Sequence, residues 1–133
     1  MVTEGKRILL LEDEPFSAWA TQRYLTIRGF RTETAATVDE ALRVAATFRP
    51  DVLVADWLLS EARSGLDAAR QIRELQPEVK VIFLTGVTSA ILTGEGGQHE
   101  LAGYRVLAKP CEPSVLVQRI VELTAPENKR QSD

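Results

Sequence analysis

Five side chains suited to phosphoryl chemistry stand where short apolar runs of the sequence end. They are Glu12, Asp13, Asp56, Thr85 and Lys109. Three carboxylates, one hydroxyl and one ammonium group offer acceptors for a cation and donors for an anion. If the fold gathers them, a carboxylate can act as a nucleophile and form an acyl phosphate.

The three acids would need a cation, because like charges within a few ångströms of one another repel strongly. Glu12, Asp13 and Asp56 offer oxygen ligands only. Such a set suits Mg²⁺, which binds through one or two carboxylates and keeps several waters. Those waters leave room for a phosphoryl group approaching Asp56, whose equatorial oxygens Lys109 and Thr85 could contact.

Five short runs predict the strands that must position these side chains. Four are almost continuously apolar, as strands buried on both faces are. The fifth alternates apolar and polar residues, which favours an edge strand. The continuous runs are residues 7–11, 52–55, 79–84 and 105–108, and the alternating run is 30–35.

Segments with helical spacing separate the strands, and their ends carry recognisable signals. Pro15 suits the first turn of a helix, and Gly29 suits the position just past a helix end. Thr37 with Glu40 and Ser64 with Asp67 have the spacing of a capping box. The predicted helices span residues 15–29, 37–48, 64–76 and 113–124. The apolar face of the third is predicted to hold Leu66, Ala69, Ile72 and Leu75.

The alternation of strands and helices predicts an α/β fold, a doubly wound five-stranded parallel sheet between two helical layers. Right-handed crossovers place the carboxyl ends of all strands along one edge. In the strand order 2-1-3-4-5 the first and third strands are neighbours at the switch point, so the three acids meet there. Residues 86–103 are glycine-rich and lack a clean period, which predicts a short or irregular fourth helix more mobile than the rest.

Composition and charge exclude several classes of protein. A chain of 133 residues suits one domain with one core, expected over residues 1–125 with a polar tail at 126–133. A net charge of −3 argues against nucleic-acid binding. A single cysteine, Cys111, allows no internal disulfide. No run is long enough to span a membrane and no signal peptide is visible, so we expect a cytoplasmic protein without a membrane partner.

Four motifs at the predicted strand ends, LLLEDEP, DVLVADW, VIFLTG and VLAKP, occur in this order. Together they resemble the receiver domain of two-component response regulators, over nearly the whole chain. The resemblance implies the flavodoxin-like, CheY-like version of the fold. It also implies that Asp56 is phosphorylated and that the Lys109–Pro110 peptide bond is cis.

The same resemblance implies a role for each site residue. Glu12 and Asp13 would hold Mg²⁺ together with Asp56 and the backbone carbonyl of Leu58. Thr85 would be the switch hydroxyl, and Lys109 would contact the phosphoryl group.

By the same resemblance, the protein is expected to be a single-domain regulator. Its phosphoryl donor would be a histidine kinase or a phosphotransfer protein. It would signal by phosphorylation-dependent protein–protein interaction or by phosphorelay, as a monomer or weak homodimer. It would catalyse only its own phosphorylation and dephosphorylation.

Some residues depart from the family pattern and leave an alternative open. Val106 stands where receivers usually carry an aromatic residue, with Tyr104 predicted on the same strand face. Ser60 replaces a proline that often follows the phosphorylated aspartate. These departures favour, as the alternative, an interaction module that works without phosphorylation.

The same residues also allow a simpler explanation, and two other functions can be weighed against them. The acids before Pro15 could serve only to charge the start of a helix. An aspartyl-phosphate phosphatase needs a second acid two residues after its nucleophile, and Leu58 stands there. A nucleotide-binding protein is disfavoured, because the acids after the first strand would repel a phosphate.

Overall fold

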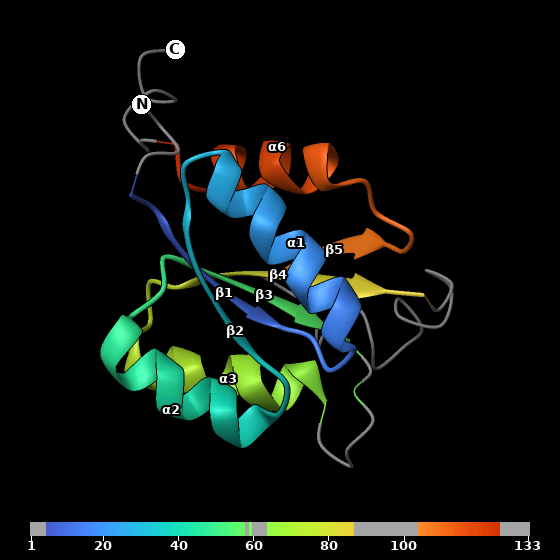
Figure 1. Cartoon of the computed structure of the whole chain (residues 1–133). Helices are drawn as coiled ribbons and strands as arrows, with labels where there is room; N and C mark the ends of the chain where they lie inside the picture. The colour runs from blue at the N-terminus through green and yellow to red at the C-terminus, as the bar shows by residue number, and fades with distance from the viewer. Residues whose placement is uncertain (1–4, 58, 60–63, 87–103, 126–133) are drawn as a thin grey trace.

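A five-stranded parallel sheet forms the middle layer of the molecule (Figure 1). The structure is a computed structural model that describes residues 5–57, 59, 64–86 and 104–125. The strands lie in the order β2-β1-β3-β4-β5, which confirms the predicted topology. Their bounds are β1 Arg7–Leu11, β2 Arg31–Ala35, β3 Val52–Asp56, β4 Lys80–Thr85 and β5 Arg105–Ala108.

The burial of each strand follows from its residue pattern. All five residues of β3 are buried, and β1 and β4 are buried except for their first residues. In β2, exposed and partly buried residues alternate up to a buried Ala35, as expected of an edge strand. Leu11 pairs with Ala35 on one side and with Ala55 on the other, so these strands end at the same edge of the sheet.

Helices cover both faces of the sheet, as predicted for a three-layer fold (Figure 1). Helices α1 and α6 lie on one face and α2 and α3 on the other. Alternate residues of one strand supply the two cores: Leu10 packs with the core of α1 and α6, and Leu11 with that of α2 and α3. The helices span α1 Pro15–Ile27, α2 Val38–Phe48, α3 Gly65–Leu75 and α6 Pro113–Leu123. The helix expected within 86–103 lies outside the described residues, apart from Gly86.

The signals at the ends of α1 act as predicted. Pro15 occupies the first turn, and the carboxylate of Glu14 accepts hydrogen bonds from the backbone N–H groups of Phe16 and Ser17. Gly29 follows the helix with φ of +101°, a conformation that favours glycine. The direction in which α1 leaves β1 is therefore set by residues next to Glu12 and Asp13.

The two predicted capping boxes differ in the structure. Ser64 and Asp67 form a complete box at the start of α3. At α2 the Thr37 hydroxyl accepts from the Glu40 N–H at 3.1 Å, but the Glu40 carboxylate accepts from the Ala36 N–H. Both helices begin where the sequence predicts.

The prediction that Leu75 lies on the buried face of α3 is wrong. Leu75 is 59% exposed, whereas Leu66, Ala69 and Ile72 are buried. Gln76 takes the next inward position, where its side-chain amide donates to the Pro50 carbonyl at 2.6 Å. Because successive helical residues are about 100° apart, Leu75 points away from the core.

In the part of the chain that the structure describes, no helix is both long enough and apolar enough to cross a membrane.

Candidate functional site

The five residues singled out in the sequence lie at one edge of the sheet, where the strands end. Glu12 and Asp13 follow β1, Asp56 ends β3, Thr85 ends β4 and Lys109 follows β5. Backbone hydrogen bonds continue past the strands and hold these ends together. They run from Trp57 N–H to Leu84 O at 2.8 Å, from Lys109 N–H to Thr85 O at 2.7 Å, and from Glu12 N–H to Ala35 O at 2.9 Å.

The three acids form a compact cluster. Glu12, Asp13 and Asp56 each offer one carboxylate oxygen, and these oxygens lie within 4.8 Å of one another. Glu12 is 5% exposed and Asp56 is 4% exposed. Buried carboxylates at such distances need positive charge nearby. The oxygen-only donor set fits Mg²⁺, whereas the Leu58 carbonyl, expected as a further ligand, lies outside the described residues.

Lys109 supplies part of that positive charge. Its Nζ lies 2.9 Å from Asp56 Oδ1 and 3.8 Å from Glu12 Oε1. Partial burial alone would lower the pKa of Lys109, but the hydrogen bond and negative charge of Asp56 outweigh that effect and raise it. Lys109 is therefore a cation at neutral pH, and it lies close to the carboxylates of Asp56 and Glu12.

The ion pair with Lys109 does not fully offset the effects that disfavour the negative charge of Asp56. Burial first, and then the neighbouring Glu12, raise the pKa of Asp56 to about 7, while Lys109 acts in the opposite direction. Its Oδ1 atom is sealed from solvent and forms the ion pair with Lys109. A further cation beside Asp56 would favour its ionised form.

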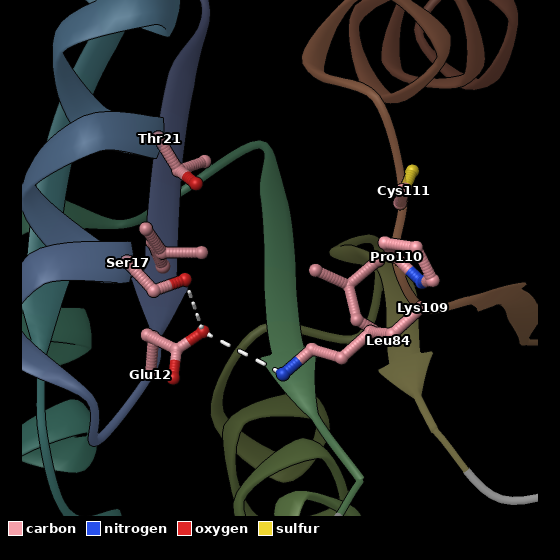
Figure 2. Close-up of a pocket in the computed structure, with 8 residues that line it drawn as sticks. Glu12, Ser17, Thr21, Leu84, Lys109, Pro110 and Cys111 are labelled. Atoms are coloured by element: carbon pink, nitrogen blue, oxygen red, sulfur yellow. Dashed lines mark hydrogen bonds and ion pairs between the residues drawn. The ribbon is translucent and has the colours of Figure 1, made fainter.

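Glu12 is held in place by two hydrogen bonds from the segment that follows β1. The Glu14 N–H donates to Oε2 at 3.1 Å, and the Ser17 hydroxyl donates to Oε1 at 3.2 Å. Figure 2 shows Oε1 between Ser17 and Lys109.

A cavity of about 450 Å³ lies beside the acids, between α1 and the turn after β5 (Figure 2). Apolar side chains line it together with the charged Glu12 and Lys109 and the hydroxyl-bearing Ser17 and Thr21. The lining residues are Leu10, Glu12, Ser17, Thr21, Leu84, Lys109, Pro110 and Cys111. One wall of the site is therefore open rather than packed.

Two residues in contact with the site were not singled out in the sequence. The Ser17 hydroxyl donates a hydrogen bond to Glu12, and its position in the first turn of α1 was the only signal of this contact in the sequence. Gly65 lies against Asp56: a Cβ atom on Gly65 would overlap the Asp56 carbonyl oxygen and lie 3.3 Å from the Ala55 Cβ. Gly65 is the first residue of α3, directly after the capping residue Ser64, and that position alone gave no signal of its close approach to Asp56.

The residues flanking the site have packing contacts. The Trp57 ring lies 5.2 Å from that of Phe83, which lies 5.1 Å from Tyr104. Tyr104 and Val106 pack against the same core, as predicted for residues on one strand face.

The Lys109–Pro110 peptide bond is cis, as expected. Partial burial raises the pKa of the Cys111 thiol, so Cys111 behaves as a small half-buried side chain.

Three comparisons with known proteins agree on one family. The model of the response regulator receiver domain matches residues 8–121. The chain is 34% identical over 116 residues to the phyllosphere-induced regulator PhyR of Methylorubrum extorquens, covering 86% of this chain and 40% of PhyR. It is 25% identical over 117 residues to the chemotaxis protein CheY of Thermotoga maritima, covering 87% and 95% of the two chains.

Solved structures have the same fold. The response regulator TrrA of Thermotoga maritima, in complex with Mg²⁺-BeF, superposes with a TM-score of 0.75 at 25% identity, covering 89% of this chain and 98% of TrrA. By contrast, the chain spans less than half the length of PhyR.

Proposed function

This chain belongs to the response regulator receiver domain family, and from that membership we propose that Asp56 accepts a phosphoryl group from the phosphohistidine of a histidine kinase or phosphotransfer protein. One observation carries the proposal. Asp56 is a buried carboxylate with Lys109 Nζ at 2.9 Å and the oxygens of Glu12 and Asp13 in the same cluster.

Mg²⁺ is the cofactor that this donor set fits. Glu12, Asp13 and Asp56 would hold it, and when bound it would neutralise charge on the acids and on the phosphoryl oxygens. The similarity to TrrA, which was solved with Mg²⁺-BeF, supports this assignment. The raised pKa of Asp56 agrees with this assignment, because a further cation would favour its ionised form.

The residues of this chain have distinct tasks in the transfer. A carboxylate oxygen of Asp56 attacks phosphorus, and the new O–P bond forms as the P–N bond to the donor imidazole breaks. The imidazole nitrogen leaves with the electron pair. Lys109 meets the charge of the phosphoryl oxygens, and the Thr85 hydroxyl at the end of β4 donates to one of them. Attack of water on phosphorus later restores the carboxylate and releases phosphate.

The output belongs to the same proposal. In the cytoplasm, the phosphorylated chain changes its affinity for another protein or passes the phosphoryl group on. It catalyses no reaction beyond its own phosphorylation and dephosphorylation. The half-buried Val106 in β5 favours one competing function, an interaction module that works without phosphorylation.

Incubation with Mg²⁺ and acetyl phosphate, followed by intact-mass measurement, tests the proposal. We expect the wild-type chain to gain one phosphoryl group and Asp56→Asn to gain none. Asp51→Asn is the matched control, because Asp51 lies just before the opposite end of β3 and accepts from the Arg7 N–H. If neither acetyl phosphate nor a phosphorylated histidine kinase modifies Asp56, the proposal is wrong and the phosphorylation-independent module is favoured.

A further inference from the structure

Ser17 is the residue of α1 whose side chain reaches the acidic cluster. Its hydroxyl donates to Glu12 Oε1 at 3.2 Å, while the Glu14 backbone N–H donates to Oε2 at 3.1 Å. Both oxygens of a buried carboxylate are therefore held, one by the backbone and one by a side chain. Hydrogen bonds to an ionised acceptor in a buried site are stronger than those between neutral groups.

The same oxygen of Glu12 is attracted by the Ser17 hydroxyl and by the Lys109 ammonium group. Glu12 Oε1 lies 3.8 Å from Lys109 Nζ, and that ammonium lies 2.9 Å from Asp56 Oδ1. If Glu12 turned further towards Lys109, its oxygens would leave the cluster with Asp13, and the Lys109 ammonium would be drawn away from Asp56. The hydrogen bond from Ser17 restrains Glu12 against that rotation.

Packing alone does not restrain Glu12 on this side. The cavity of about 450 Å³ between α1 and the turn at Lys109 and Pro110 borders Glu12 directly (Figure 2). A glutamate side chain has one more rotatable bond than an aspartate, and here it has free volume to use. Its orientation must therefore come from its hydrogen bonds.

We propose that Ser17 is a positioning residue that orients Glu12 towards the cation held with Asp13 and Asp56, and thereby sets the affinity for Mg²⁺. This inference rests on the proposed function, since it assumes that the acids hold Mg²⁺. Removing a partner that orients a metal-binding side chain typically weakens metal binding by about tenfold or more.

A Mg²⁺ titration monitored by the fluorescence of Trp57 tests the inference. All variants carry Trp19→Phe, because Trp19 on α1 is the other tryptophan of the chain and is 55% exposed. We expect Ser17→Ala to raise the dissociation constant for Mg²⁺ about tenfold. Ser17→Thr retains the hydroxyl and should restore it to within about twofold of the parent.

Thr21→Ala is the matched control. Thr21 lies one turn further along α1 and lines the same cavity, and among the described residues no hydrogen bond joins it to Glu12. We expect it to leave the affinity for Mg²⁺ unchanged. If only Ser17→Ala loses affinity for Mg²⁺, the loss is due to the missing hydrogen bond to Glu12. A general loosening of the cavity would lower the affinity of both variants.

The possible outcomes separate this inference from the proposed function. If the parent binds Mg²⁺ and Ser17→Ala binds it equally well, the role of Ser17 is wrong and the proposed function stands. If the parent shows no saturable response to Mg²⁺ by fluorescence or by calorimetry, both are wrong. Ala has the highest helix propensity, so Ser17→Ala should fold. If it does not, Ser17→Cys, which keeps the size but has a weak donor, should show the same direction of change.

Discussion

At the scale of single residues, the site is dominated by charge that is only partly balanced. Asp56 is buried beside Glu12, and both effects favour its neutral form, while the single ammonium of Lys109 favours the ionised form. The balance leaves the pKa of Asp56 at about 7. Small changes in local charge therefore shift Asp56 between its two forms at neutral pH.

This pKa predicts a pH dependence of stability in the metal-free protein. Between its ordinary value of 3.8 and about 7, the native state keeps the Asp56 proton while the unfolded chain has lost it. Stability therefore falls as the pH rises through this range, and the loss is complete above pH 7. Asp56→Asn removes the titrating group, so it should be more stable than wild type at pH 8.

Chemical denaturation in EDTA across pH 5 to 8 measures the difference. The advantage of Asp56→Asn should shrink as the pH falls from 7 towards 5, because the wild-type carboxyl group becomes protonated. An advantage that stays constant over this range would contradict the raised pKa.

At the scale of elements, the turn from β3 to α3 fixes the backbone of Asp56. The Trp57 carbonyl accepts from the Gly65 N–H at 3.2 Å, and the Gly65 Cα approaches the Asp56 carbonyl so closely that no side chain fits between them. The complete capping box of Ser64 and Asp67 holds the start of α3 in this position. The backbone of Asp56 is thus held by both the strand and the helix.

Gly65→Ala should destabilise the protein although alanine is the better helix former. The new methyl group would overlap the Asp56 carbonyl oxygen, and overpacking of this kind typically costs about 1–3 kcal/mol. Gly86→Ala is the control, since a Cβ there has open space around it. Chemical denaturation of both variants measures the effect, and equal stability of the two would show that the turn can relax.

At the scale of the whole molecule, the order of the strands in the sheet decides which strand ends become neighbours. The sheet order places β3 between β1 and β4, with β5 next to β4, so that acids from two strands meet a lysine that follows a third. Helices α1 and α6 cover one face of the sheet, and α2 and α3 cover the other (Figure 1). Asp56 therefore lies at the carboxyl ends of the strands, close to the cavity bordered by Glu12 and Lys109.

Mg²⁺ bound as proposed should stabilise the whole fold, because Glu12, Asp13 and Asp56 come together only in the native state. At a hundred times its dissociation constant the expected gain is about 2.7 kcal/mol. Thermal unfolding with Mg²⁺ and at matched ionic strength without it measures this gain. Asp13→Asn should lose most of it and Asp51→Asn should keep it; an equal gain in both variants would assign the effect to non-specific ions.

Much of this architecture could be predicted from local sequence patterns. The apolar runs predicted all five strands, and Pro15, Gly29, Thr37 and Ser64 predicted the helix ends, because strand alternation and helix capping depend on neighbours in the chain. The handedness of crossovers then brought Glu12, Asp13, Asp56, Thr85 and Lys109 to one edge. These predictions needed no knowledge of side-chain contacts.

Other features were decided by the tertiary structure alone. The exposure of Leu75, the bond from Ser17 to Glu12, the approach of Gly65 to Asp56 and the raised pKa of Asp56 each depend on how elements pack in space. A periodic pattern fixes a helix face only to within about one residue, or 100° of rotation. Hydrogen bonds and charge interactions vary over a few ångströms, so the sequence determined which groups meet, and packing determined how they act on one another.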